Sequence, residues 1–114
     1  MINWVLLDDN SKLLKAIEES FTKDVVIFKH STTCSISLMS KRRLEEDWDD
    51  LENIIPYYLD LKSFRSISDE VAERFSVQHE SPQILLIRQG ECIYDASHFD
   101  ITIAELKETL VFHA

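Results

Sequence analysis

Four apolar runs along the chain have the length and composition of β-strands. The first, residues 24–30, contains the β-branched and aromatic run VVIF, which is typical of a buried strand. The second covers residues 54–61. The last two, residues 83–88 and 92–96, flank a turn that contains Gly90, where the absence of a side chain permits a positive φ. We therefore expect these last two runs to form an antiparallel hairpin.

Between these runs, apolar residues recur at a spacing of three or four, which is typical of helices with one buried face. The predicted buried faces are Leu13, Ile17 and Phe21; Ile36, Met39, Leu44 and Trp48; Ile67, Val71 and Phe75; and Ile103, Leu106 and Leu110. Polar residues that can cap these helices are Asp9, Asn10 or Ser11 for the first, Ser66 or Ser68 for the third, and Asp100 or Thr102 for the last.

This alternation predicts an α/β fold in which a small mixed sheet carries helices on both faces. Strands that are connected through helices have to be parallel, whereas the hairpin strands are antiparallel. Residues 1–8 are expected to add a short strand or a packed arm, with Trp4 at the edge of the core. Pro56 indicates an edge position or a strand end. The 114 residues include one glycine and two prolines, so we expect one domain over residues 1–114 with short loops and no linker.

The charge balance excludes some classes of partner. The formal net charge is −9, which disfavours nucleic acids and anionic membrane surfaces. The only basic cluster, residues 41–43, is followed directly by the acidic residues 45–47. No apolar run approaches the ~18 residues of a membrane helix, and the first ten residues lack the basic start of a secretory signal. We expect a cytoplasmic protein, whose thiols stay reduced.

Candidate chemistry centres on Cys34, which lies where the first strand gives way to a helix. The N–H groups and the positive dipole end of a helix start favour a thiolate, so this position predicts a reactive sulfur, although cysteine is also often a small buried apolar residue. Cys92 follows the hairpin turn, roughly 25–30 Å of strand from Pro82. A disulfide needs Cα atoms within ~7 Å, so Cys92 is not expected to resolve Cys34. The two cysteines and four histidines are too scattered for a zinc site.

Three segments strengthen the case for redox chemistry. They are FKHSTTCSIS (residues 28–37), VQHESPQ (residues 77–83) and SHFDIT (residues 97–102). Together they resemble the signature segments of the monothiol bacilliredoxin family, a thioredoxin-like group of the bacillithiol system, and the resemblance runs from Trp4 to Leu110. It implies a thioredoxin-like fold. Ser35 departs from the family pattern, which commonly has proline directly after the cysteine.

The resemblance implies a monothiol disulfide reductase that removes bacillithiol from bacillithiolated client proteins. Cys34 would be the nucleophile, and Ser37, where dithiol relatives have a resolving cysteine, would donate a hydrogen bond to its sulfur. Bacillithiol would be a co-substrate, with no tightly bound cofactor, and a separate reductase would recycle bacillithiol disulfide. The resemblance further implies a cis Pro82 beside Cys34 and a free backbone edge at Ser81. The implied substrate-binding residues are Thr33, Ser35, Ser81, Pro82, Ser97, His98 and Asp100.

Several alternatives stay open at this point. His30 could lower the pKa of Cys34 if it were charged, but a histidine at a strand end is more often structural, and the same holds for His79. An iron–sulfur monothiol glutaredoxin-like protein would need a dimer and external thiols around Cys34. A thioredoxin-like chain can also keep its fold and serve only as a protein-interaction module.

Overall fold

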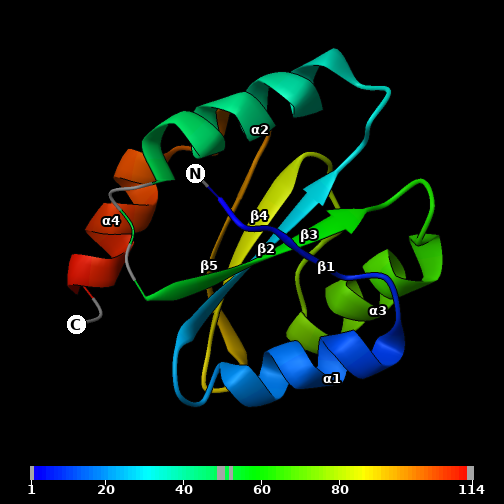
Figure 1. The fold of residues 1–114 in the computed structure, drawn as a ribbon, viewed down its shortest axis with the longest axis vertical. Helices are drawn as coiled ribbons and strands as arrows, with labels where there is room; N and C mark the ends of the chain where they lie inside the picture. The colour runs from blue at the N-terminus through cyan, green and yellow to red at the C-terminus, as the bar shows by residue number, and fades with distance from the viewer. Residues whose placement is uncertain (1, 49–50, 52, 113–114) are drawn as a thin grey trace.

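A five-stranded mixed sheet runs through the centre of the molecule (Figure 1). The structure is a computed structural model that describes residues 2–48, 51 and 53–112. Its strand order is β1-β3-β2-β4-β5. The strands are β1 (Val5–Leu6), β2 (Asp24–His30), β3 (Ile54–Asp60), β4 (Gln83–Arg88) and β5 (Glu91–Ser97). The helices are α1 (Asn10–Glu19), α2 (Ser35–Asp47), α3 (Arg65–Phe75) and α4 (Ile103–Phe112), and a 3₁₀ turn, η2, covers His98–Asp100.

The pairing of the strands matches the order of the connections. β3 runs parallel to β1 and β2, while β4 is antiparallel to both β2 and β5. The central strand β2 is therefore flanked by one parallel and one antiparallel neighbour. Pro56 pairs with Val26 of β2, and β1 reaches only Tyr57 and Tyr58, so Pro56 lies where β3 has no second neighbour. This agrees locally with the predicted edge position or strand end, although β3 as a whole lies between β1 and β2.

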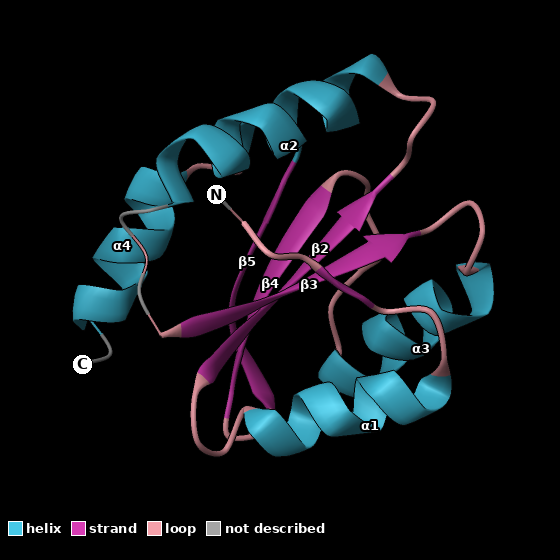
Figure 2. Cartoon of the chain, viewed as in Figure 1, coloured by secondary structure: helices cyan, strands magenta, loops and turns pink. Residues whose placement is uncertain are grey.

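Helices cover both faces of the sheet, as expected for this fold class. α2 and α4 lie on one face, and α1 and α3 lie on the other (Figure 2). Alternate residues of β2 serve the two layers: Val26 and Phe28 pack under α2 and α4, and Val25 and Ile27 pack under α1 and α3. A continuous apolar strand buried on both sides is what the run VVIF predicts.

Two predicted helix faces differ from the observed ones. In α2 the buried positions are Ser37, Ser40 and Leu44, whereas Met39 is half exposed. The first turns of the helix bury serines, so apolar spacing alone misplaced the face. Phe21 lies beyond the end of α1 and is 61% exposed, so its place on the inner face was wrong.

The helix caps were predicted in part. Asp9 caps α1, since its carboxylate accepts a hydrogen bond from the Lys12 N–H at 2.8 Å. Thr102 caps α4 by accepting from the Glu105 N–H at 3.2 Å. The prediction for α3 was wrong, because this helix begins directly after Phe64, without a side-chain cap. Ser68 is instead a buried residue inside α3.

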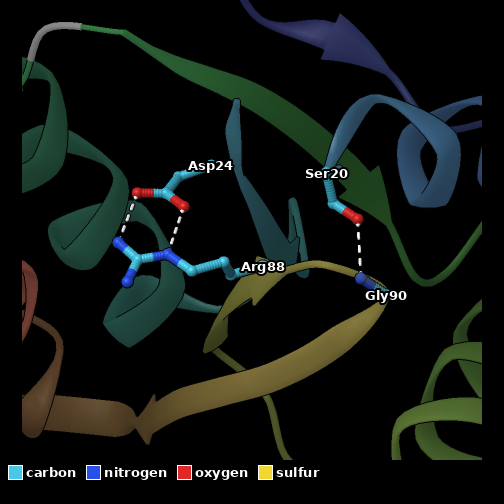
Figure 3. Close-up of polar contacts among 4 residues, drawn as sticks. All are labelled: Ser20, Asp24, Arg88 and Gly90. Atoms are coloured by element: carbon cyan, nitrogen blue, oxygen red, sulfur yellow. Dashed lines mark hydrogen bonds and ion pairs between the residues drawn. The ribbon is translucent and has the colours of Figure 1, made fainter. Parts of the chain in front are cut away.

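Polar contacts fasten the hairpin turn at the sheet end where β2 begins (Figure 3). The Arg88 guanidinium donates two hydrogen bonds to the Asp24 carboxylate, at 2.8 and 2.9 Å. Beside them, the Gly90 N–H donates to the Ser20 hydroxyl at 2.9 Å. These contacts tie the β4–β5 turn to the segment that joins α1 to β2. None of the described helices is both long and apolar enough to span a membrane.

Candidate functional site

Cys34 lies at the N-cap of α2, four residues beyond the end of β2. Its backbone is extended, with φ −104° and ψ 123°, and its carbonyl accepts the first intrahelical hydrogen bond, from the Leu38 N–H at 3.1 Å. Its own N–H donates to the Ser31 carbonyl at 3.1 Å. The turn of residues 31–34 thus delivers the side chain, which is partly exposed, to the positive end of the helix dipole.

The surroundings of Cys34 favour its thiolate. Hydrogen bonds from the backbone N–H groups of Ser37 and then of Ile36 lower its pKa. Desolvation opposes them, and the Ser37 hydroxyl makes the smallest contribution, which also lowers the pKa. Ser37 is fully buried, and its oxygen accepts a hydrogen bond from the Ser31 N–H at 3.4 Å. The hydroxyl proton therefore stays available to the sulfur. The donation to the sulfur that the resemblance implies for Ser37 stays a prediction.

Ser35, the departure from the family pattern, occupies the first helical position and is exposed. Proline is favoured at this position because the N–H it lacks has no partner within the helix. Serine at this position leaves the start of the helix intact, since α2 begins at Ser35.

The segment before β4 meets the end of β5 at the same edge of the sheet. The Ser81–Pro82 peptide bond is cis, as the resemblance implied, and Pro82 is buried. Its carbonyl accepts a hydrogen bond from the His98 N–H at 3.0 Å, and Ser97 pairs with Gln83. Since Gln83 also pairs with Lys29 of β2, this edge adjoins the strand that leads to Cys34. The structure thus brings Ser81, Pro82, Ser97 and His98 together.

The remaining candidate binding residues flank this edge. His98 and Asp100 are exposed in η2, and the His98 Nδ1 lies 3.5 Å from the Glu80 carboxylate. The η2 backbone is anchored to α2, since the Ser40 hydroxyl donates to the His98 carbonyl at 3.4 Å. Asp100 can accept hydrogen bonds from hydroxyl or amine groups, but as a carboxylate it would repel an acidic one.

Thr33 lies on the opposite side of the site from Asp100, next to the end of β3. Its hydroxyl lies 3.3 Å from the Ser31 hydroxyl and 3.5 Å from the Lys62 Nζ. Lys62 follows the end of β3, and its exposed ammonium is a cation close to the Cys34 turn that the sequence analysis did not single out. The sequence contained a signal for Lys62, because the parallel strands β2 and β3 end at the same edge of the sheet.

The two ambiguous histidines are held by structural contacts. His30 is 1% exposed and its ring packs between those of Phe28 and Tyr58. Burial lowers its pKa, so it is neutral at pH 7 and does not supply a positive charge to Cys34. Burial also lowers the pKa of His79, whose Nδ1 lies 3.4 Å from the Lys29 Nζ and 3.3 Å from the Ser68 hydroxyl.

Lys29 is a further residue that sequence reasoning missed. It is fully buried, and burial lowers the pKa of its ammonium to about 8. It lies on the α3 face of β2 and contacts the segment that leads to Pro82 through His79. Alternation along the strand shows that its side chain faces a core layer, but the sequence does not show that the layer is closed over it.

Cys92 lies at the far end of the hairpin, opposite Ile87 of β4. Its thiol donates to the Tyr94 carbonyl at 3.2 Å, and burial raises its pKa to about 11. It packs against the layer under α1 and α3. This placement agrees with the prediction of a packed strand residue that does not resolve Cys34.

Comparison with known proteins assigns the chain to a family. The model of the family monothiol bacilliredoxin BrxC matches residues 5–106. The chain belongs to the monothiol bacilliredoxin family. In the structure, the three segments that resemble the family's signatures meet at one edge of the sheet. They contribute Cys34 from the first, Ser81 and Pro82 from the second and His98 from the third. Among the residues that the structure describes, no three His, Cys, Asp or Glu side chains gather as metal ligands would.

Solved structures agree with the thioredoxin fold of this bacilliredoxin. A protein provisionally described as an oxidoreductase with a thioredoxin fold is 30% identical, with a TM-score of 0.83 over 93% of this chain and 92% of that chain. The thioredoxin of Trypanosoma brucei brucei is 12% identical, with a TM-score of 0.78 over 97% and 90%. Oxidised mitochondrial thioredoxin 3 of Saccharomyces cerevisiae is 15% identical, with a TM-score of 0.76 over 96% and 94%. The last two share the fold alone. Family and site together support a role in thiol–disulfide exchange.

Proposed function

We propose that this bacilliredoxin removes bacillithiol from protein mixed disulfides through Cys34 alone. The observation that carries the proposal is the Cys34 thiol at the start of α2, where the N–H groups of Ser37 and Ile36 lower its pKa. A thiolate near neutral pH is the attacking species in thiol–disulfide exchange. Ser37 takes the position of a resolving cysteine, so the exchange is completed by a second thiol from solution.

The reaction consists of two exchanges at Cys34. The thiolate attacks the bacillithiol sulfur of the mixed disulfide, and the client cysteine leaves as a thiolate that takes a proton from solvent. A second bacillithiol thiolate then attacks the same bacillithiol sulfur, now bonded to Cys34. Cys34 leaves as a thiolate and bacillithiol disulfide is released. One free bacillithiol is consumed for each client, its sulfur joins the bacillithiol sulfur taken from the mixed disulfide, so that one disulfide replaces another, and Cys34 returns to its starting state.

The edge around Pro82 is the proposed place for the substrate. A client strand would pair with the backbone at Ser81, the mode in which an extended peptide joins a sheet edge. Thr33, Ser35 and Ser81 would lie by the sugar-acid part of bacillithiol, and Ser97, His98 and Asp100 would lie by the client half of the mixed disulfide. Bacillithiol acts as a co-substrate in the cytoplasm, and a separate bacillithiol disulfide reductase regenerates it.

Intact mass spectrometry tests this proposal. The reduced protein is mixed at neutral pH with a bacillithiol mixed disulfide, and the adduct is mapped by peptide digestion. We expect one bacillithiol on Cys34, reversed by free bacillithiol, in the wild type and in Cys92→Ser. Cys34→Ser should form no adduct. A Cys34 that stays unmodified in folded protein would refute the function, as would full activity of Cys34→Ser on a bacillithiolated client.

A further inference from the structure

A groove of about 450 Å³ lies beside the cis proline, on the side of β5. Its walls are the segment that links α3 to β4 and the end of β5 with η2. Glu80 and Gln83 lie on one wall, and Asp95 and Asp100 lie on the other. Ser97, which pairs with Gln83 beside Pro82, also lines it, so the groove opens next to the proposed docking edge for clients.

Gln83 gives this groove an acceptor that needs a donor. The residue is 1% exposed, and its side-chain N–H donates to the Gln78 carbonyl at 3.0 Å. Its Oε1 is buried and has no hydrogen-bond partner among the described residues. A buried acceptor without a partner is costly, so this atom favours a ligand that brings an N–H group.

The charge of the groove specifies the kind of donor. Its lining includes the three carboxylates of Glu80, Asp95 and Asp100 and neither lysine nor arginine among the described residues. Glu80 lies near a basic side chain, the His98 imidazole at 3.5 Å. A neighbouring pocket shares Asp95 and Asp100 and adds Glu105, so the acidic surface continues towards α4. Among the groups that bring N–H donors, an ammonium or guanidinium group also complements the three carboxylates.

We propose that this groove binds a lysine or arginine side chain of the client protein, close in sequence to the modified cysteine. The inference rests on the proposed function, because it names the class of client that the Cys34 site prefers. The client is the occupant rather than bacillithiol, since the acid part of bacillithiol would be repelled by three carboxylates. The groove also adjoins Ser97 and Pro82, where a client strand would lie.

Matched peptides test the inference. Short peptides share a central bacillithiolated cysteine and differ only in the flanking residues, which are lysine, glutamine or glutamate. Exchange rates are measured for the wild type, for Asp95→Asn, and for Glu91→Gln. Glu91 lies on the same strand as Asp95 and is exposed at the far end of the hairpin. Glu91→Gln removes the same charge as Asp95→Asn and therefore serves as the control. Dipyridyl disulfide, a small neutral disulfide, reports the reactivity of Cys34 itself.

We expect the wild type to react roughly tenfold faster with the lysine peptide than with the glutamate peptide at low salt, and the preference to shrink as salt rises. Asp95→Asn should lose about threefold of this preference, while Glu91→Gln keeps it and both react normally with dipyridyl disulfide. Equal rates for all peptides, or equal effects of the two substitutions, would overturn the inference. Reaction with dipyridyl disulfide but with no bacillithiolated peptide would instead overturn the proposed function.

Discussion

The buried Lys29 is expected to weaken the fold at neutral pH, and Lys29→Met should reveal this. Its ammonium has no exposed surface, and its hydrogen-bond partner is the His79 ring at 3.4 Å. Burial is the main cause of its lowered pKa, and the positive charge of Arg65 adds to it, while Asp69 opposes it. Methionine has a similar length and shape but no charge, so it removes the desolvation cost and preserves the packing.

The size and sign of the effect follow from the pKa of Lys29. Folding lowers this pKa from 10.5 to about 8, and the difference corresponds to about 3 kcal/mol of charge burial at pH 7. Loss of the contact with His79 costs about 1 kcal/mol, so Lys29→Met should be more stable by about 2 kcal/mol at pH 7. Between pH 8 and 10.5 the unfolded chain binds a proton that the folded chain lacks, so the wild type gains stability as pH rises, by about 2 kcal/mol at pH 9.5.

Urea unfolding of both proteins at several pH values between 7 and 9.5 measures this difference. Burial raises the pKa values of Cys92 and Tyr57, which destabilises both proteins equally at high pH, so their effect cancels. His79 stays neutral throughout this range, because burial lowers its pKa. Lys15→Met, on the exposed face of α1, is the control and should show no such dependence. A stability difference between Lys29→Met and wild type that is constant from pH 7 to 9.5 would refute the reasoning.

Three further predictions follow from single contacts. Ser37→Ala should raise the pKa of Cys34. The rate of alkylation of Cys34 should then be about threefold slower than in the wild type at pH 7 and equal to it well above the pKa. An unchanged pH profile of this rate would contradict the prediction. Arg88→Met should cost about 1–2 kcal/mol in urea unfolding, because it removes both hydrogen bonds to the Asp24 carboxylate, and a loss below 0.5 kcal/mol would show that the pair is screened. Gly90→Ala should cost about 1 kcal/mol, since φ is +79° at this turn, and a neutral result in the same assay would refute the strain.

The strands and the topology could be predicted because each carries a local signal. The run VVIF is apolar on both sides, and β2 is indeed buried on both faces. The turn at Gly90 fixed the hairpin, and parallel pairing followed from the connecting helices. The face of α2 could not be predicted, because Ser37 and Ser40 are buried by their position above the sheet edge and not by their hydrophobicity. Burial of small polar residues depends on neighbours from other elements, which periodicity does not report.

The placement of the site could be predicted from the sequence, but its charges could not. The position of Cys34 after a strand and before a helix indicates a stabilised thiolate, and the resemblance supplied the cis Pro82. The parallel pairing of β2 and β3 places Lys62 near the Cys34 turn, but its contact with Thr33 and the acidic groove around Gln83 depend on how side chains from different segments pack in space. A single sequence does not report that packing.

The strand order places opposite charges on the two sides of Cys34. Lys62 approaches the Cys34 turn from the end of β3, through Thr33, while Asp95 and Asp100 line the groove on the side of β5. A mixed disulfide between bacillithiol and a protein has two halves that differ in charge, one of them carrying the sugar acid. In the proposed reaction Cys34 attacks the bacillithiol sulfur and releases the client, so the two halves need distinct places. The charges on the two sides of Cys34 would then direct the acidic half towards Lys62 and a basic client segment towards the groove, which would orient the disulfide for the productive attack.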